Sequence, residues 1–182
     1  MKFAYSTNAF KRYSLDESLD LIKKIGFDAV EIMADRPHLY PPDYGPEEIS
    51  RLKRKLDALG LAVSNLNTFT LFAVGDMHHP SWIERDEEKR GIRIRHTRDC
   101  LALAMELSCP NISTQPGGVA GHLPREEAVS LFLSGLAEVV QDAKRLGVRI
   151  LVEPEPGLLM ENSAQFEEFL TAVDTAVVGL NC

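Results

Sequence analysis

Residues 148–157, VRILVEPEPG, hold the most informative strand of the chain. The branched side chains within residues 148–152 predict a buried β-strand, which must end at the two prolines because proline cannot donate to a sheet ladder. A carboxylate at the end of a buried strand is costly unless a metal ion or another cation pairs with it. The stretch therefore predicts a functional site that contains Glu153, with Glu155 beside it.

The junction before this strand recurs along the chain. A helix end, a glycine and an apolar strand follow one another at residues 25–30, 59–63 and 146–150, and residues 107–112 repeat the pattern without the glycine. Strict alternation of helices and short apolar strands is typical of a parallel sheet covered by helices. The first strand is not followed by a G-x-G-x-x-G motif, which argues against dinucleotide binding. Repetition of one unit favours a (β/α) barrel of TIM-barrel type over a doubly wound open sheet.

The expected strands lie at residues 2–6, 27–33, 61–66, 111–114, 148–152 and 176–180. The helices between them begin at recognisable signals, which are the capping boxes 14–17 and 81–84, Pro46, Pro124 and Asn162. These elements make about five and a half of the eight units of a barrel, which typically has about 250 residues. We therefore expect residues 1–182 to form a single barrel domain that is incomplete at its C-terminal end; the alternative is an open six-stranded α/β sheet.

Composition narrows the function classes. A net charge of −7 argues against a nucleic-acid partner, because phosphate contacts need clustered Lys and Arg. No apolar run is long enough to cross a bilayer, and no signal peptide is recognisable. The three cysteines, Cys100, Cys109 and Cys182, lack metal or disulfide spacing, which is typical of a reducing compartment. We expect a cytoplasmic protein without a membrane partner. A homo-oligomer is compatible with the sequence.

Four motifs, in order, carry a resemblance to a known family: KIGFDAVE at 24–31, PNISTQP at 110–116, LVEPEP at 151–156 and VGLN at 178–181. Together they resemble the xylose isomerase-like barrel superfamily, the sugar phosphate isomerase/epimerase group that also holds endonuclease IV. The resemblance covers essentially the whole chain. It implies a metal-dependent isomerase or epimerase of a small sugar or sugar-like hydroxy-carbonyl compound, which moves a proton through an enediolate.

The resemblance also implies a divalent metal ion, Mn²⁺, Mg²⁺, Co²⁺ or Zn²⁺, at the carboxyl ends of the strands. Its ligands would be a Glu after strand five, an Asp after strand six, a His from strand seven and a Glu after strand eight. Only the first matches this chain, at Glu153, which would be both metal ligand and catalytic proton carrier. The expected Asp would fall just beyond Cys182. The alternative for Glu153 is a salt bridge to an Arg or Lys of the barrel.

Other polar residues follow the predicted strands and are candidates for substrate binding. Glu155 would accept from a substrate hydroxyl or remain a rim carboxylate. Glu31 would form hydrogen bonds inside the site. Asn8, Asn67 and Gln115 carry amides suited to sugar hydroxyls, although such residues are more often turn or loop amides.

The long loop after the third strand offers weaker candidates. His78 and His79 resemble a metal pair, but adjacent histidines in an extended loop point apart. Phe69, Phe72 and Trp82 would form an apolar lid or fold the loop onto the rim. His96 lies among arginines on a helix and is expected at the surface or in packing.

Three rival functions remain open. An inosose dehydratase-like lyase would use the same metal site. A nuclease of the endonuclease IV kind would need a basic groove and more histidines, although His78 and His79 lie where that enzyme has a metal histidine. A non-catalytic sugar-binding barrel is the third.

Overall fold

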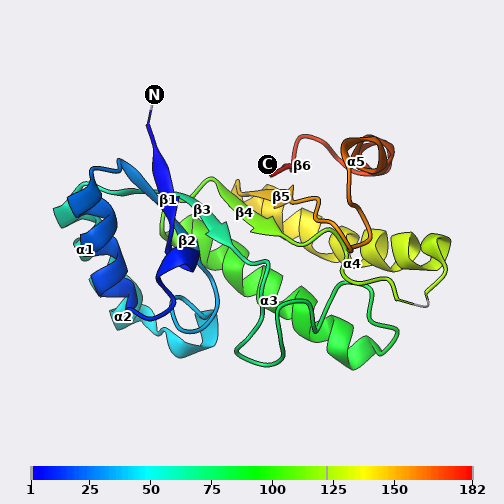
Figure 1. Ribbon diagram of the computed structural model, residues 1–182, viewed down its shortest axis with the longest axis horizontal. Helices are drawn as coiled ribbons and strands as arrows, with labels where there is room; N and C mark the ends of the chain where they lie inside the picture. Colours follow the sequence, from blue (N-terminus) through cyan, green and yellow to red (C-terminus); the bar gives the residue numbers. More distant parts are fainter. Residues whose placement is uncertain (1, 122, 182) are drawn as a thin grey trace.

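The computed structural model describes residues 2–121 and 123–181, and its centre is one parallel sheet (Figure 1). The six strands lie in chain order, and each pairs in parallel with the next. Their bounds lie within about two residues of those predicted: β1 Ala4–Ser6, β2 Ala29–Met33, β3 Ala62–Asn67, β4 Asn111–Thr114, β5 Arg149–Val152 and β6 Val178–Leu180.

Five α-helices and two short 3-10 helices connect these strands within the described residues. They are η1 Thr7–Phe10, α1 Leu15–Ile25, η2 Pro41–Asp43, α2 Pro46–Leu59, α3 Glu87–Glu106, α4 Arg125–Leu146 and α5 Ser163–Leu170. Ser14 and Glu17 form the expected capping box of α1. The glycines after α1, α2 and α4 adopt φ values of 109°, 60° and 68°, so the helices end where the sequence predicted.

The predicted start of α3 at Ser81 is wrong. The Ser81 N–H does donate to Glu84 at 3.0 Å, but the bond closes a turn rather than a helix. Asp86 is the actual N-cap, because its Oδ1 accepts from the backbone N–H groups of Glu88 at 2.9 Å and Lys89 at 3.3 Å. The turn directs Trp82 into the core, where the residue is fully buried. The helix therefore begins only at Glu87.

The core lies between the sheet and its helices. Alternate strand residues point into this core: Val30, Ile32, Val63, Leu66, Ile112, Ile150, Val152 and Val178. Figure 1 shows α1 and α2 beside one end of the sheet and α4 and α5 beside the other. Cys100 and Cys109 are buried free thiols, and Cys182 lies outside the described residues.

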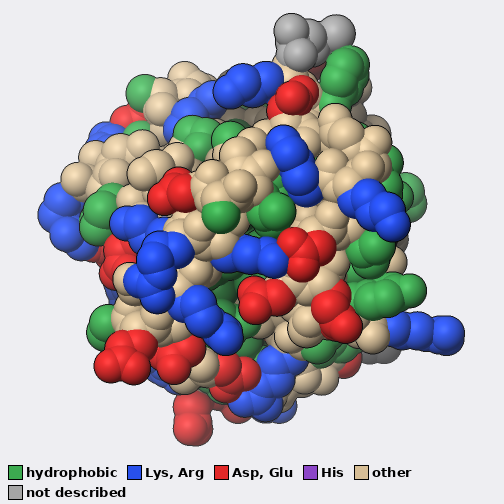
Figure 2. Space-filling view, turned by 90° about the vertical axis from the view of Figure 1, so that its left-hand side faces the viewer, with side chains coloured by type: hydrophobic (Ala, Val, Ile, Leu, Met, Phe, Trp, Pro, Cys, Tyr) green, Lys and Arg blue, Asp and Glu red, His purple; other side chains and the backbone are tan. Residues whose placement is uncertain are grey.

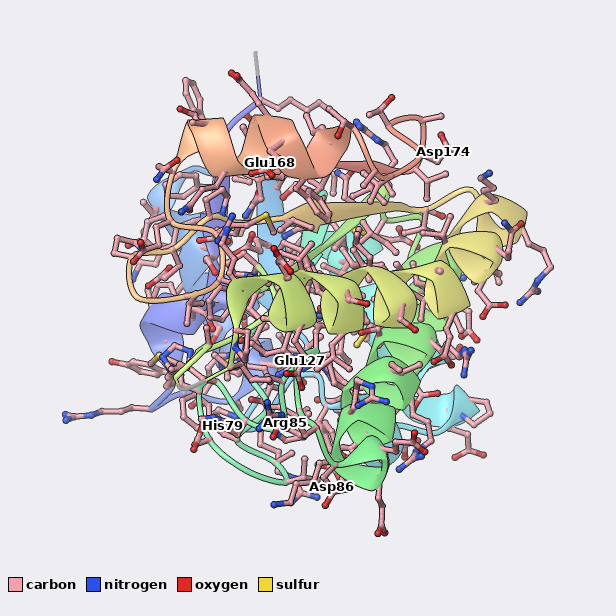
Figure 3. All side chains as sticks on the ribbon, turned by 90° about the vertical axis from the view of Figure 1, so that its right-hand side faces the viewer. His79, Arg85, Asp86, Glu127, Glu168 and Asp174 are labelled. Atoms are coloured by element: carbon pink, nitrogen blue, oxygen red, sulfur yellow. The ribbon has the colours of Figure 1, made fainter. Side chains whose placement is uncertain are left out.

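The architecture is a partial (β/α) barrel, as predicted, with six of the eight parallel strands of a closed one. Figure 2 shows lysines and arginines interspersed with acidic residues on the face that carries α1 and α2. Arg85 and Glu127, which lie close together in Figure 3, join the segment before α3 to α4 through two 2.7 Å hydrogen bonds. Among the described helices, none is long and apolar enough to cross a membrane.

Candidate active site

The site lies at the carboxyl ends of the strands, on the sheet face that does not pack against the helical core. Parallel pairing brings these ends to one edge, and the register places Ser6 beside Glu31, Glu31 beside Asn65, and Asn67 beside Ser113. A row of polar residues therefore runs across β1, β2, β3 and β4, on the face of the sheet opposite the helices. This row is the inner lining of the barrel mouth.

Glu31 is the centre of a hydrogen-bonded network in this lining. Its carboxylate accepts from Asn65 Nδ2 at 2.8 Å and from Asn67 Nδ2 at 3.3 Å, and the same Asn65 nitrogen also donates to Ser113 Oγ at 2.8 Å. These bonds fix the orientation of the Asn65 amide. Its Oδ1 is left buried and without a hydrogen-bond partner in the described part of the chain. The lining therefore keeps at least one oriented acceptor for a ligand.

Glu153 follows β5 and is half-buried at the mouth. Its Oε2 accepts a 2.6 Å hydrogen bond from Asn181 Nδ2, just after β6. Burial raises the pKa of Glu153, the hydrogen bond from Asn181 opposes the rise, and the charges of Glu31 and Glu155 add to it. The carboxylate thus sits among acidic neighbours and gains from a cation or a proton nearby.

The remaining predicted residues occupy the same edge with different surroundings. Gln115 is fully buried; its Nε2 donates to the carbonyl of His78 at 3.2 Å, and its Oε1 has no partner within the described residues. Asn67 Oδ1 accepts from Phe69 N–H at 3.1 Å, so part of its amide is used by the loop. Asn8 Oδ1 is likewise buried without a partner among the described residues. Their contact with substrate stays a prediction, as does that of Glu155.

The two loop histidines have different partners, as expected for adjacent residues, whereas Trp82 does not take part in the aromatic lid that was one of its two predicted roles. Trp82 is not part of a lid, because its indole Nε1 donates to Thr114 Oγ1 at 2.9 Å inside the core. His79 is exposed and bonds Asp76 at 3.2 Å, whereas the ring of His78 packs edge-on against Phe69. The two histidines have separate partners and do not form a metal pair.

His96 packs inside the protein instead of lying at its surface. Burial lowers its pKa to about 3, so the imidazole is neutral. It stacks on Tyr40 and contacts the thiol of Cys100. Packing was one of its two expected roles.

Three residues that form hydrogen bonds within the candidate site were not predicted from the sequence: Asn65, Ser113 and Asn181. Asn65 and Ser113 are polar residues within strands that are otherwise buried. That signal, the same one that singled out Glu31, could have marked both residues as unusual, although it does not show which face of the sheet Asn65 takes.

The lining supplies one candidate metal ligand, and the described residues do not supply a complete ligand set. Within residues 2–121 and 123–181, no three His, Cys, Asp or Glu side chains are grouped to bind a metal ion. Glu153 fits the role of a single carboxylate ligand, since burial beside two other carboxylates favours a positive partner. Further ligands would have to come from residues beyond this group.

The fold is a partial (β/α) barrel, and acidic residues lie at the carboxyl ends of its strands, where the candidate site is. The family model described as the xylose isomerase-like TIM barrel matches residues 19–182. The chain therefore belongs to this family. No curated protein gives a significant match.

Solved structures with the same fold agree in architecture. A D-tagatose 3-epimerase-like protein is 23% identical with a TM-score of 0.79, covering 99% of this chain and 64% of its own. The IOLI protein with a bound zinc atom is 20% identical with a TM-score of 0.77, covering 99% and 62%. An AP endonuclease, family 2, from Brucella melitensis is 19% identical with a TM-score of 0.72, covering 100% and 68%. This chain thus spans about two thirds of each neighbour's length, and at these identities the likeness establishes the fold.

Proposed function

We propose that this protein is a metal-dependent isomerase or epimerase of a small sugar or sugar-like hydroxy-carbonyl compound, and that Glu153 is its catalytic carboxylate. The observation that carries the proposal is the setting of Glu153. It ends a buried strand, one oxygen is held by Asn181 at 2.6 Å, and burial raises its pKa. Sugar epimerases among the structures of the same fold support the choice of substrate class.

The chemistry requires removal of a proton from a carbon beside a carbonyl group and its return. A carboxylate whose pKa is raised is a stronger base than an exposed one. In an isomerisation the same group would return the proton to the neighbouring carbon, whereas an epimerisation would need a second acid on the opposite face of the enediolate, from a residue outside this group. The hydrogen bond from Asn181 restricts the rotation of Glu153 and occupies Oε2, which would leave Oε1 for the proton transfer. A divalent ion would polarise the carbonyl and hydroxyl oxygens and acidify the C–H bond. Its bound zinc makes the IOLI structure a supporting precedent within the fold.

Polar residues of the lining would orient the substrate. We assign Glu31, Asn65, Asn67 and Gln115 to the hydroxyl groups, because their amides and carboxylate are already oriented by neighbours. Glu155 and Asn8 are assigned to the outer hydroxyls. We place residues 1–182 in one barrel domain that works in the cytoplasm, without nucleic-acid or membrane partners.

The test is proton exchange, measured on the full-length protein with a panel of ketoses and added Mn²⁺, Mg²⁺, Co²⁺ or Zn²⁺ in D₂O. We expect NMR to show deuterium entering at the carbon beside the carbonyl and an isomer or epimer accumulating. Glu153→Gln should lower turnover about 10²- to 10⁴-fold and weaken metal binding measured by calorimetry. Glu167→Gln, the same change at an exposed position of α5, is the control.

Each rival function gives a different result in this experiment. Loss of water from the substrate would identify a lyase on the same site. Cleavage of abasic DNA without sugar exchange would identify a nuclease, like the family 2 AP endonuclease of the same fold. Sugar binding without exchange would identify a non-catalytic barrel. Unchanged turnover in Glu153→Gln would contradict the proposed role of Glu153.

A further inference from the structure

The loop after β3, residues 68–80, reaches the ends of several neighbouring strands. At one side, the ring of Phe72 lies under Lys11, which follows β1, with Nζ 4.9 Å from the ring centroid. At the other side, the carbonyl of His78 accepts from Gln115, which follows β4, at 3.2 Å. The loop therefore extends over the mouth from the β1 side to the β4 side.

Asp35, which follows β2, holds the middle of this loop. It is fully buried, and its Oδ2 accepts from Thr70 Oγ1 at 2.9 Å and from Phe72 N–H at 2.6 Å. Its Oδ1 accepts from Ala73 N–H at 3.0 Å and from Arg36 N–H at 2.8 Å. A buried carboxylate is costly unless its lone pairs are used, and here four donors use them. Three of the four belong to the loop, so the carboxylate fixes its backbone.

Arg93 of α3 holds both ends of the same loop. Its Nε donates to the carbonyl of Pro80 at 2.9 Å, and its Nη1 donates to the carbonyl of Thr68 at 2.7 Å. The guanidinium is fully buried, and its planar geometry can bridge the two carbonyls. The loop is thus fixed at its two ends by one side chain and at its centre by another.

The fixed loop brings two unused polar atoms onto residues that contact each other at the end of β4. His78 Nδ1 and Gln115 Oε1 are both buried without a hydrogen-bond partner in the described part of the protein. Buried polar groups are nearly always paired, so these two atoms are candidates for hydrogen bonds to a bound ligand. Phe69 packs edge-on against His78, with ring centroids 6.3 Å apart, and adds an apolar surface. Hydroxyl groups on a carbon chain match this mixture.

We propose that residues 68–80 are the specificity element of the mouth and that Asp35 is its positioning residue. Asp35 fixes the loop so that His78 and Gln115 bind substrate hydroxyl groups on the β3–β4 side of Glu153. This inference rests on the proposed function, because the hydroxyl groups are those of the proposed sugar. Asp35 itself contacts only the loop and Arg36, and it acts on binding through the loop.

The test compares Asp35→Asn and Thr70→Val with wild type in the full-length protein. Both variants remove part of the clamp and leave Glu153 intact. We expect KM to rise about 5- to 50-fold while kcat stays within about twofold, because uniform binding is lost rather than chemistry. Hydrogen exchange at the amides of Phe72 and Ala73 should accelerate. The control is Ser18→Ala, which removes the hydrogen bond from the buried Ser18 hydroxyl to the carbonyl of Ser14 at α1. It should change neither KM nor the hydrogen exchange of the loop.

Thr70→Val keeps the test decisive if Asp35→Asn does not fold, because valine matches the shape of threonine. An unchanged KM together with faster loop exchange would overturn the specificity role, and unchanged exchange would overturn the clamp. A fall in kcat at constant KM would also contradict the proposal. If wild type binds a sugar without converting it, the proposed function fails, and Kd replaces KM in the same comparison. A wild-type protein that neither binds nor converts any sugar overturns both.

Discussion

Arg93 allows a quantitative test of the loop clamp through protein stability. Burial lowers the pKa of Arg93 to about 10, and the side chain is fully buried. At neutral pH the guanidinium is charged in both the folded and the unfolded state, since its pKa lies far above 7 in both. The lowered pKa therefore corresponds to a cost to folding on the order of 3 kcal/mol. The hydrogen bonds to Thr68 and Pro80 offset this cost, at about 1.5–3 kcal/mol each.

Two substitutions separate these contributions. Arg93→Met removes both hydrogen bonds, a loss of roughly 3–6 kcal/mol, but also removes the cost of about 3 kcal/mol for the buried charge. The expected net loss is about 0–3 kcal/mol. Arg93→Lys keeps a buried charge, and its compact ammonium reaches only one of the two carbonyls. Arg93→Lys should lose about 1.5–3 kcal/mol of stability for the missing hydrogen bond, and the cost of the buried charge remains. The charge-conserving variant is thus expected to be at least as unstable as the apolar one.

Urea unfolding at pH 7 measures both losses. Circular dichroism follows the backbone, and the fluorescence of the single tryptophan, Trp82, follows the core beneath the loop. Arg12→Lys, at an exposed position, is the control and should match wild type. The opposing contributions assigned to the buried cation would be refuted if Arg93→Lys were as stable as wild type while Arg93→Met lost more than about 5 kcal/mol of unfolding free energy. Burial of the charge would then not cost what the hydrogen bonds are said to offset.

Two further predictions concern the site and its support. Because burial raises the pKa of Glu153, its ionised form disfavours the folded state at neutral pH, and the penalty disappears as pH falls below the ordinary range of a carboxyl group. Glu153→Gln should therefore raise the melting temperature at pH 7 and have little effect near pH 4, measured by calorimetry; a larger gain at low pH would contradict this. Gly118→Ala should cost about 2–4 kcal/mol in urea unfolding, because φ is 131° and the new Cβ would lie 2.6 Å from the Cβ of Ser81. Gly121→Ala, with φ of 55° and no atom within 4 Å, should cost only about 1 kcal/mol; equal losses would contradict the predicted clash.

The sequence predicted the fold well because its signals are local. The glycines after α1, α2 and α4 and the apolar runs after them specify helix ends and strands without reference to the rest of the chain. The exception was α3. Ser81 and Glu84 satisfy the capping-box pattern, yet the burial of Trp82 and its bond to Thr114 overrode it. That contact joins residues 32 positions apart in sequence, beyond the reach of a local pattern.

The site was harder to predict because one irregularity in the sheet decides which side chains face the mouth. By simple alternation Asn65 would share the core side of β3 with Val63. The register between β2 and β3 shifts after Val30, so that Val30 pairs with Val63 but Glu31 pairs with Asn65. Ser64 is the extra residue, and its Oγ donates to the carbonyl of Val30 at 3.2 Å. This bulge turns Asn65 to the inner face, as bulges near active sites commonly do. The Glu31–Asn65 network therefore depends on one inserted residue, and no periodicity in the sequence could have shown it.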